Sequence, residues 1–92
     1  MTKTALITGA NRGIGLEIVR QLGQIGFHVF LAARNSAKGE AASKALQNKS
    51  LNVEFIPLDV GDMESIQRAV QLVKSKTPQL DILINNAGVL LD

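Results

Sequence analysis

Four short apolar segments alternate along the chain with three longer segments in which apolar residues recur every three or four positions. A short apolar run is typical of a buried strand, and the longer spacing is typical of an amphipathic helix. The pattern therefore predicts strands over residues 4–8, 27–33, 51–58 and 80–84, with one helix between each successive pair. Pro57 has no backbone amide to donate, which suits an edge strand or the end of a strand.

Each expected helix has its own boundary signals. The first starts in a glycine-rich turn and ends near Gly23 and Gly26, Asn35 or Ser36 can cap the second, and Asp62 can cap the third. The side chains expected to face the sheet are Ile14, Ile18, Val19, Leu22 and Ile25 in the first helix, Ala37, Ala41, Ala45 and Leu46 in the second, and Met63, Ile66, Val70 and Val73 in the third. The small residues of the second helix would let it lie close to the sheet.

The order of the elements predicts the fold. Strands and helices that alternate in this way form parallel sheets with right-handed crossovers. We therefore expect an α/β fold, a Rossmann-type doubly wound parallel sheet with four strands in the order 3-2-1-4. Residues 1–92 form one domain, the truncated first half of such a fold. Two helices should cover one face and the third helix the other, with a ligand crevice between the first and fourth strands.

Composition and charge exclude several classes of function. The net charge is only +2, the basic residues are scattered, and neither Trp nor Tyr is present, so no nucleic-acid partner is expected. The absence of cysteine excludes disulfides and thiolate metal sites and fits a reducing compartment. No apolar run approaches the ~20 residues of a membrane span and no signal peptide is visible, so a cytoplasmic location is expected. His28, the one histidine, is expected at a strand end and not in a metal site.

The turn after the first strand carries the strongest functional signal. Residues 8–15 read Thr-Gly-Ala-Asn-Arg-Gly-Ile-Gly, a G-x-x-x-G-x-G spacing between a buried strand and a helix. Gly9 permits a tight exit from the strand, Gly13 lets a pyrophosphate approach the backbone, and Gly15 lets the helix pack against the strand. The alternative is a purely structural turn. The position of the glycines in a strand–helix–strand unit favours phosphate binding at the start of the helix.

The end of the second strand indicates which dinucleotide is bound. An acidic residue about 20 residues past the glycines would hold the ribose hydroxyls of NAD. Here that position is Ala33, followed by Arg34, and Arg12 lies within the glycine turn. A guanidinium can bind a 2′-phosphate through two hydrogen bonds, so NADP(H) is the expected cofactor. Alternatively, both arginines are simply solvated. Lys38 could also reach the phosphate, but the sequence gives no further support for it.

Three motifs in register resemble the short-chain dehydrogenase/reductase family. They are residues 8–15, Leu-Asp-Val at 58–60 and Asn-Asn-Ala-Gly at 85–88, and the resemblance extends over all 92 residues. The glycine turn and Ala-Ala-Arg at 32–34 look most like the carbonyl-reductase-like members.

The resemblance also implies roles for individual residues. Cofactor contacts are implied for Gly9, Asn11, Arg12, Gly13, Ile14 and Gly15 around the phosphates, Arg34 at the 2′-phosphate, Asp59 and Val60 at the adenine, and Asn86, Ala87 and Gly88 at the adenine-side ribose. Asp59 would accept a hydrogen bond from the exocyclic amine of adenine. The alternative for Asp59 is a turn at the strand end, and Asn85 is expected to bond to backbone and not to cofactor.

The family's catalytic Tyr-x-x-x-Lys pair has no counterpart here, because the chain contains no tyrosine and ends four residues after the Asn-Asn-Ala-Gly segment. We therefore predict no catalytic residue and no metal site on this chain. The expected function is the NADP(H)-binding segment of a reductase that transfers hydride between NADPH and a carbonyl or alcohol substrate. The alternative is a stand-alone nucleotide-binding or self-associating scaffold fragment. The open edge of the fourth strand would favour a homo-oligomer.

Overall fold

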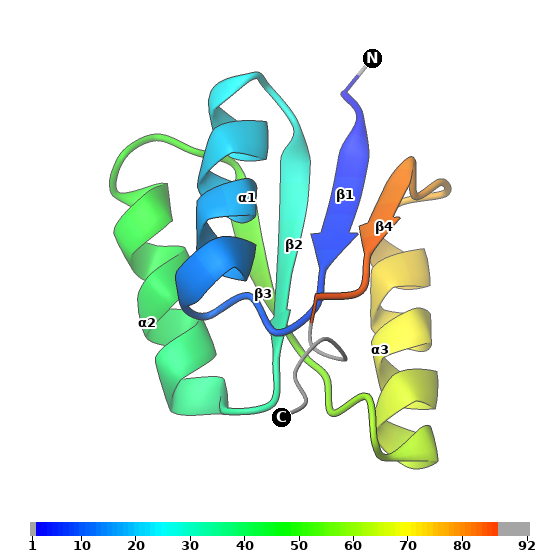
Figure 1. Cartoon of the computed structure of the whole chain (residues 1–92). Coiled ribbons are helices and arrows are strands. Elements are labelled where there is room, and N and C mark those ends of the chain that lie inside the picture. Colours follow the sequence, from blue (N-terminus) through cyan, green and yellow to red (C-terminus); the bar gives the residue numbers. More distant parts are fainter. Residues whose placement is uncertain (1, 87–92) are drawn as a thin grey trace.

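A computed structural model describes residues 2–86, which form a parallel four-stranded sheet flanked by three helices (Figure 1). The elements are β1 (Thr4–Ile7), α1 (Gly13–Gln24), β2 (His28–Ala33), α2 (Ser36–Gln47), β3 (Val53–Pro57), α3 (Met63–Lys76) and β4 (Ile82–Ile84). The strand order is β3-β2-β1-β4 and all three pairings are parallel. This confirms the Rossmann-type α/β fold and the predicted strand order. β3 is an edge strand that ends at Pro57, as the missing amide of proline suggested.

All four strands are shorter than the apolar pattern predicted, β1 and β2 by a single residue and β3 and β4 by more. β3 begins only at Val53, because Leu51 packs under α1 beside Gly23 instead of extending the strand. β4 begins at Ile82, because the preceding residues are held by the side chain and backbone of Thr4. The Thr4 amide donates to Asp81 Oδ2 at 2.8 Å, and Thr4 Oγ1 donates to the carbonyl of Gln79 at 2.6 Å.

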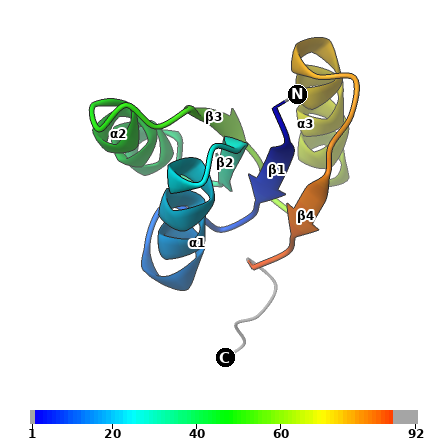
Figure 2. The same cartoon turned by 90° about the horizontal axis from the view of Figure 1, so that it is seen from above.

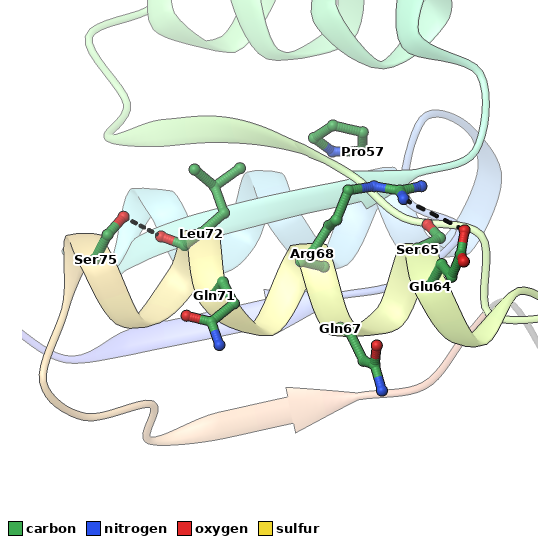
Figure 3. A pocket seen from close by; sticks show the side chains of 9 residues that line it. Pro57, Glu64, Ser65, Gln67, Arg68, Gln71, Leu72 and Ser75 are labelled. Atoms are coloured by element: carbon green, nitrogen blue, oxygen red, sulfur yellow. Dashed lines mark hydrogen bonds and ion pairs between the residues drawn. The ribbon is translucent and has the colours of Figure 1, made fainter.

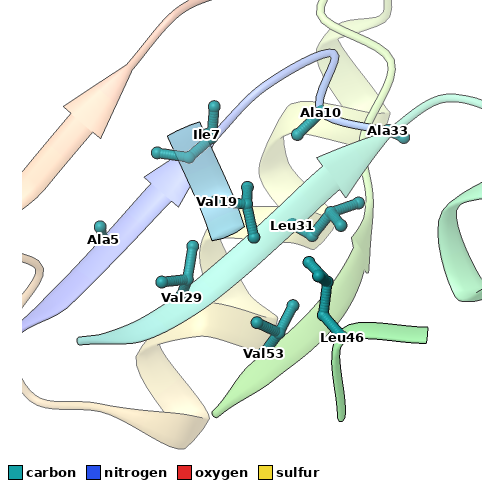
Figure 4. Close-up of a cluster of buried hydrophobic side chains, with 9 residues drawn as sticks. All are labelled: Ala5, Ile7, Ala10, Val19, Val29, Leu31, Ala33, Leu46 and Val53. Atoms are coloured by element: carbon teal, nitrogen blue, oxygen red, sulfur yellow. The ribbon is translucent and has the colours of Figure 1, made fainter. Parts of the chain in front are cut away.

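The sheet is covered unequally, as predicted, with α1 and α2 on one face and α3 alone on the other (Figures 1 and 2). Alternate residues of the strands face the two layers. The core under α1 and α2 is formed by Ala5, Ile7, Ala10, Val19, Val29, Leu31, Ala33, Leu46 and Val53 (Figure 4). The smaller core under α3 is formed by Leu6, Phe30, Ala32, Ile56, Ala69 and Val73.

The predicted inward stripe of α1 is partly wrong. Val19 is fully buried, but Ile14 and Ile25 are 75% and 71% exposed. The buried residues of the helix are Gly15, Val19 and Gly23, four positions apart. The two glycines bring the helix close to the turn after β1 and to Leu51, which precedes β3. Ile18 and Leu22 of the predicted stripe do pack against the core.

The stripe of α2 is also wrong for its three alanines. Ala37, Ala41 and Ala45 are exposed, and the buried residues are Gly39, Ser43 and Leu46. The expected close approach of this helix is present nevertheless, because a Cβ placed on Gly39 would lie 2.1 Å from Cε1 of Phe55 in β3. The Asn35 side chain caps the helix by accepting from the Lys38 amide at 2.9 Å. Of the two caps that the sequence allowed, Asn35 and Ser36, the first is therefore the one present.

In α3, too, small residues are buried where larger apolar residues were predicted. Asp62 caps this helix, accepting from the Glu64 amide at 3.0 Å, as predicted. Met63 and Val70 are 67% and 45% exposed, although both were expected to face the sheet. The residues that do pack against it are Ser65, Ala69 and Val73, again four positions apart. No helix among residues 2–86 has the length and apolar character that crossing a membrane requires.

Candidate functional site

A groove of about 840 Å³ lies where β1, β2 and β3 end, beside the start of α1 and α2. Its walls are formed by Gly9, Asn11, Arg12, Gly13, Ile14, Arg34, Asn35, Lys38, Leu58, Asp59, Val60 and Asn86. Ligands of open α/β sheets bind at this end, outside the carboxyl ends of the strands. The parallel sheet therefore brings together segments that lie up to 77 residues apart in the sequence, such as Gly9 and Asn86.

Most of the residues predicted for the site line this groove. Within the described residues, every one of them lies on its wall except Gly15, which lies beneath the turn. Ala87 and Gly88 lie outside the described residues. The groove also contains Asn35, which was predicted only as a helix cap, and Leu58. Their position directly after β2 and β3 could have identified them, since any residue at these strand ends faces the same edge of the sheet.

The glycine turn is shaped for an anion at the start of α1. Gly9 and Gly13 have φ angles of 59° and 64°, a left-handed conformation that favours glycine. Arg12 occupies the N-cap position, but neither its side chain nor an acidic residue in the first turn caps the helix. The first amides of a helix carry a partial positive charge and have no partner within the helix. Those of α1 are therefore available to a phosphate.

The Asn-Asn segment after β4 holds this turn in place. Asn86 Nδ2 donates to the Gly9 carbonyl at 3.1 Å, and Thr8 Oγ1 donates to Asn85 Oδ1 at 2.9 Å. A Cβ on Gly15 would lie 2.7 Å from Asn86 Nδ2 and 2.8 Å from the Gly9 oxygen. The absence of a side chain at position 15 thus makes room for the amide that fixes Gly9. Among the described residues, Asn85 accepts from the side chain of Thr8, and the expected bond to backbone stays a prediction.

Asp59 is held rigidly where the chain leaves β3. Its Oδ1 accepts from the Gly61 amide at 3.0 Å, and its carbonyl accepts from the Asp62 amide at 3.0 Å. Its own amide donates to Ser65 Oγ at 2.8 Å. Asp59 therefore does form a turn at the strand end, the alternative to a binding role. Its place on the groove wall is compatible with both roles.

Charge is distributed unevenly around the groove. Arg12, Arg34 and Lys38 line it near the ends of β1 and β2, and Asp59 lines it near the end of β3. Within residues 2–86, none of the three cations forms an ion pair. Among the described residues, the site thus offers unpaired positive charge near the ends of β1 and β2 and a carboxylate near the end of β3.

Other charged groups lie away from the groove. His28 begins β2, at the opposite end of that strand from Arg34, and its Nε2 is 3.4 Å from Oε1 of Glu54, which also pairs with Lys76. Hydrogen bonds from Arg20 and Gln21 lower the pKa of the exposed Glu17 carboxyl to about 2. The described part of the chain contains no group of three or more His, Asp or Glu residues placed to hold a metal ion.

A second depression, of about 1120 Å³, runs along α3 beside Pro57 (Figure 3). Although it is larger, its walls come almost entirely from one helix. Its one cation, Arg68, lies 4.0 Å from the carboxylate of Glu64, and Ser75 Oγ donates to the Leu72 carbonyl within the helix. The start of α3 at its edge is already capped by Asp62, and its two described charged groups, Arg68 and Glu64, pair with each other, so the groove at the strand ends is the better candidate for a ligand site.

Comparison with known proteins agrees with this geometry. A family model described as short chain dehydrogenase matches residues 3–92. The chain is 50% identical over 91 residues to (-)-isopiperitenone reductase of Mentha piperita, covering 92% of this chain and 28% of that protein. It is 44% identical over 89 residues to carbonyl reductase (NADPH) 1 of Sus scrofa, covering 96% of this chain and 31% of that protein. The solved structure of menthone neomenthol reductase from Mentha piperita superposes with a TM-score of 0.91 at 39% identity, covering 97% of this chain and 32% of that chain.

The sheet order and the glycine turn define a Rossmann-type α/β protein. The chain belongs to the short-chain dehydrogenase family, as the resemblance of its three motifs indicated. It spans about a third of the length of the relatives it matches, between 28% and 32% of each.

Proposed function

We propose that the groove binds NADP(H), and that this chain is the cofactor-binding segment of a reductase that transfers hydride between NADPH and a carbonyl or alcohol. The observation that carries the proposal is the charge after β2, where Ala33 stands in place of the acid that favours NAD and Arg34 follows it, with Arg12 and Lys38 in the same groove. A carboxylate there would repel a 2′-phosphate, whereas a guanidinium binds one. The 44% identity to a carbonyl reductase whose name includes NADPH supports the same cofactor.

The walls of the groove fit the parts of this cofactor. We assign the 2′-phosphate to Arg12 and Arg34, with Lys38 as a third cation beside them, and the pyrophosphate to the uncapped start of α1. We assign the adenine to Asp59. A cofactor placed in this orientation would also contact the remaining wall residues, which are Gly9, Asn11, Gly13, Ile14, Val60 and Asn86. We propose contacts with Ala87 and Gly88 as well, which lie outside the described residues.

These residues bind and orient the cofactor, and NADPH supplies the hydride. The sequence contains no tyrosine, so none of these 92 residues can provide the tyrosine proton donor that the family uses. The carbonyl reduction itself is therefore proposed for the reductase as a whole, and NADP(H) binding for the residues described.

The cofactor assignment is tested by calorimetric titration of the purified protein with NADPH and with NADH. Arg34→Asp should weaken NADPH binding about 10- to 100-fold, because charge-assisted hydrogen bonds to the 2′-phosphate are lost, and should change NADH binding little. Arg68→Asp is the matched control, since Arg68 lies on α3 outside the groove. Equal losses for both nucleotides would contradict the assignment to NADP(H).

We propose as a second function that the isolated chain self-associates through β4. Within the described residues, β4 pairs only with β1, and Leu83 at its centre is 64% exposed. An open strand edge with an exposed apolar side chain favours pairing with another chain.

We also propose a cytoplasmic location, which the absence of cysteine supports.

A further inference from the structure

Ser65, in the first turn of α3, is not a wall residue of the groove, yet it contacts one. We propose that Ser65 is a positioning residue that sets the preference of the site for adenine, by fixing the direction in which Asp59 leaves the sheet. The inference rests on the proposed binding of NADP(H). It adds a residue of α3 to a site otherwise formed by the ends of the strands and the helices α1 and α2.

The backbone ladder shows where Ser65 acts. The Leu58 amide donates to the Ala33 carbonyl at 3.0 Å, which continues the pairing of β3 with β2 one residue past Pro57. The next amide, that of Asp59, donates to Ser65 Oγ at 2.8 Å. Successive amides of a strand point to opposite sides, so the Asp59 amide points away from β2, and the hydroxyl of Ser65 is the group that receives it.

The environment of Ser65 explains why a serine matters at this point. Ser65 is only 8% exposed and belongs to the ridge of α3 that packs against the sheet. The next residue of that ridge is Ala69, so an alanine would suit the packing equally well. A buried hydroxyl is unfavourable unless it forms a hydrogen bond. The bond to the Asp59 amide is therefore the feature that distinguishes serine from alanine here.

The consequence for binding follows from the other bonds of Asp59. Oδ1 is held by the Gly61 amide, so the orientation of the carboxylate is coupled to that of the backbone. An acceptor fixed in advance loses little conformational freedom when a ligand donates to it. The exocyclic amine of adenine is such a donor. Without the Ser65 hydroxyl, the turn at Asp59 loses its connection to α3 and the carboxylate is no longer fixed for that amine.

The test compares two ligands of the purified protein, NADPH and its analogue with hypoxanthine in place of adenine, which carries an oxygen where adenine carries the amine. The unmodified protein should bind NADPH more tightly than the analogue. Ser65→Ala should reduce the ratio of the two affinities by roughly 3- to 10-fold, the net value of about one hydrogen bond. Ser65→Thr, which keeps a hydroxyl, should restore the ratio. Ser75→Ala is the matched control on the same helix, because its hydroxyl bonds only to the Leu72 carbonyl among the described residues.

Asp59→Ala should abolish the preference, and adding Ser65→Ala to it should cause no further change in the ratio. If Ser65→Ala does not fold, Ser65→Cys, which has a weak acceptor of similar size, is measured in its place. An unchanged ratio, or equal losses for both ligands, would overturn the positioning role while leaving NADP(H) binding intact. Failure of the unmodified protein to bind either ligand would instead overturn the proposed function, and the role of Ser65 with it.

Discussion

At the scale of the residue, Gly15 shows how one missing side chain links the fold to the site. A Cβ there would lie 2.8 Å from the Gly9 oxygen and 3.0 Å from the Ala10 Cα, both backbone atoms, and 2.7 Å from Asn86 Nδ2. The sequence assigned Gly15 to the packing of the helix against the strand, whereas the atoms nearest to it belong to the turn after β1 and to Asn86. The hydrogen bond from Asn86 to Gly9 that occupies the same space could not be predicted, since it joins residues 77 positions apart.

Gly15→Ala should therefore destabilise the protein by about 1–3 kcal/mol, the usual effect of overpacking a site whose neighbours cannot move. Gly23→Ala is the matched control on the same helix. Its added Cβ would meet only the Leu51 side chain, at 3.3 Å, and it gains up to about 1 kcal/mol of helix propensity. The free energy of unfolding in urea measures both variants. A Gly15→Ala protein as stable as the unmodified one would show that the turn adapts.

At the scale of the element, the sequence predicted the existence, type and order of all seven helices and strands, but the inner faces of the helices only in part. Val19, Leu46 and Val73 are buried as predicted. Residues such as Ile14 and Met63 were assigned to the inner stripes because they are apolar, yet both are more than 60% exposed. The buried ridges instead contain small residues, such as Gly39 and Ser65. Hydrophobicity alone cannot identify such a ridge, because its advantage is the close approach of a helix to the sheet.

The contact between Gly39 of α2 and Phe55 of β3 gives a quantitative test of that close approach. An alanine at position 39 gains about 1 kcal/mol of helix propensity over glycine, but its Cβ would lie 2.1 Å from the Phe55 ring. In the Phe55→Ala background, Gly39→Ala should be stabilising by about that amount. In the unmodified background it should be neutral or destabilising, because the ring has to move.

A double-mutant cycle of unfolding free energies measures the difference between the two backgrounds. A coupling of about 1 kcal/mol or more is expected between positions 39 and 55. Equal effects of Gly39→Ala with and without the ring would contradict the close contact.

At the scale of the whole molecule, the unequal covering of the sheet leaves apolar side chains exposed. Leu83 lies beside Leu6 in the register of β1 and β4, on the face that only α3 covers, and it is 64% exposed. Leu83→Lys should weaken self-association of the isolated chain about 10- to 100-fold, as expected for removing one large apolar side chain from a contact. Sedimentation over a range of concentrations measures the dissociation constant.

The matched control is Ile25→Lys, since Ile25 is 71% exposed and follows α1, on the other face of the sheet. It should leave the association unchanged. A chain that sediments as a monomer at every concentration would contradict self-association through β4.

The sequence by itself determined the order of the elements, the parallel sheet and most of the groove. These follow from local periodicity, from the handedness of strand–helix–strand connections and from the rule that ligands bind at the carboxyl ends of the strands. For that reason the glycine turn and Arg34 could be assigned to one site before the structure was known, and the resemblance of residues 58–60 to the family implied the same site for Asp59. Only the tertiary structure decided which small residues of the helices are buried and that Ser65 of α3 bonds to the Asp59 amide. Both depend on how closely backbones approach across the sheet, and no pattern along the chain encodes that distance.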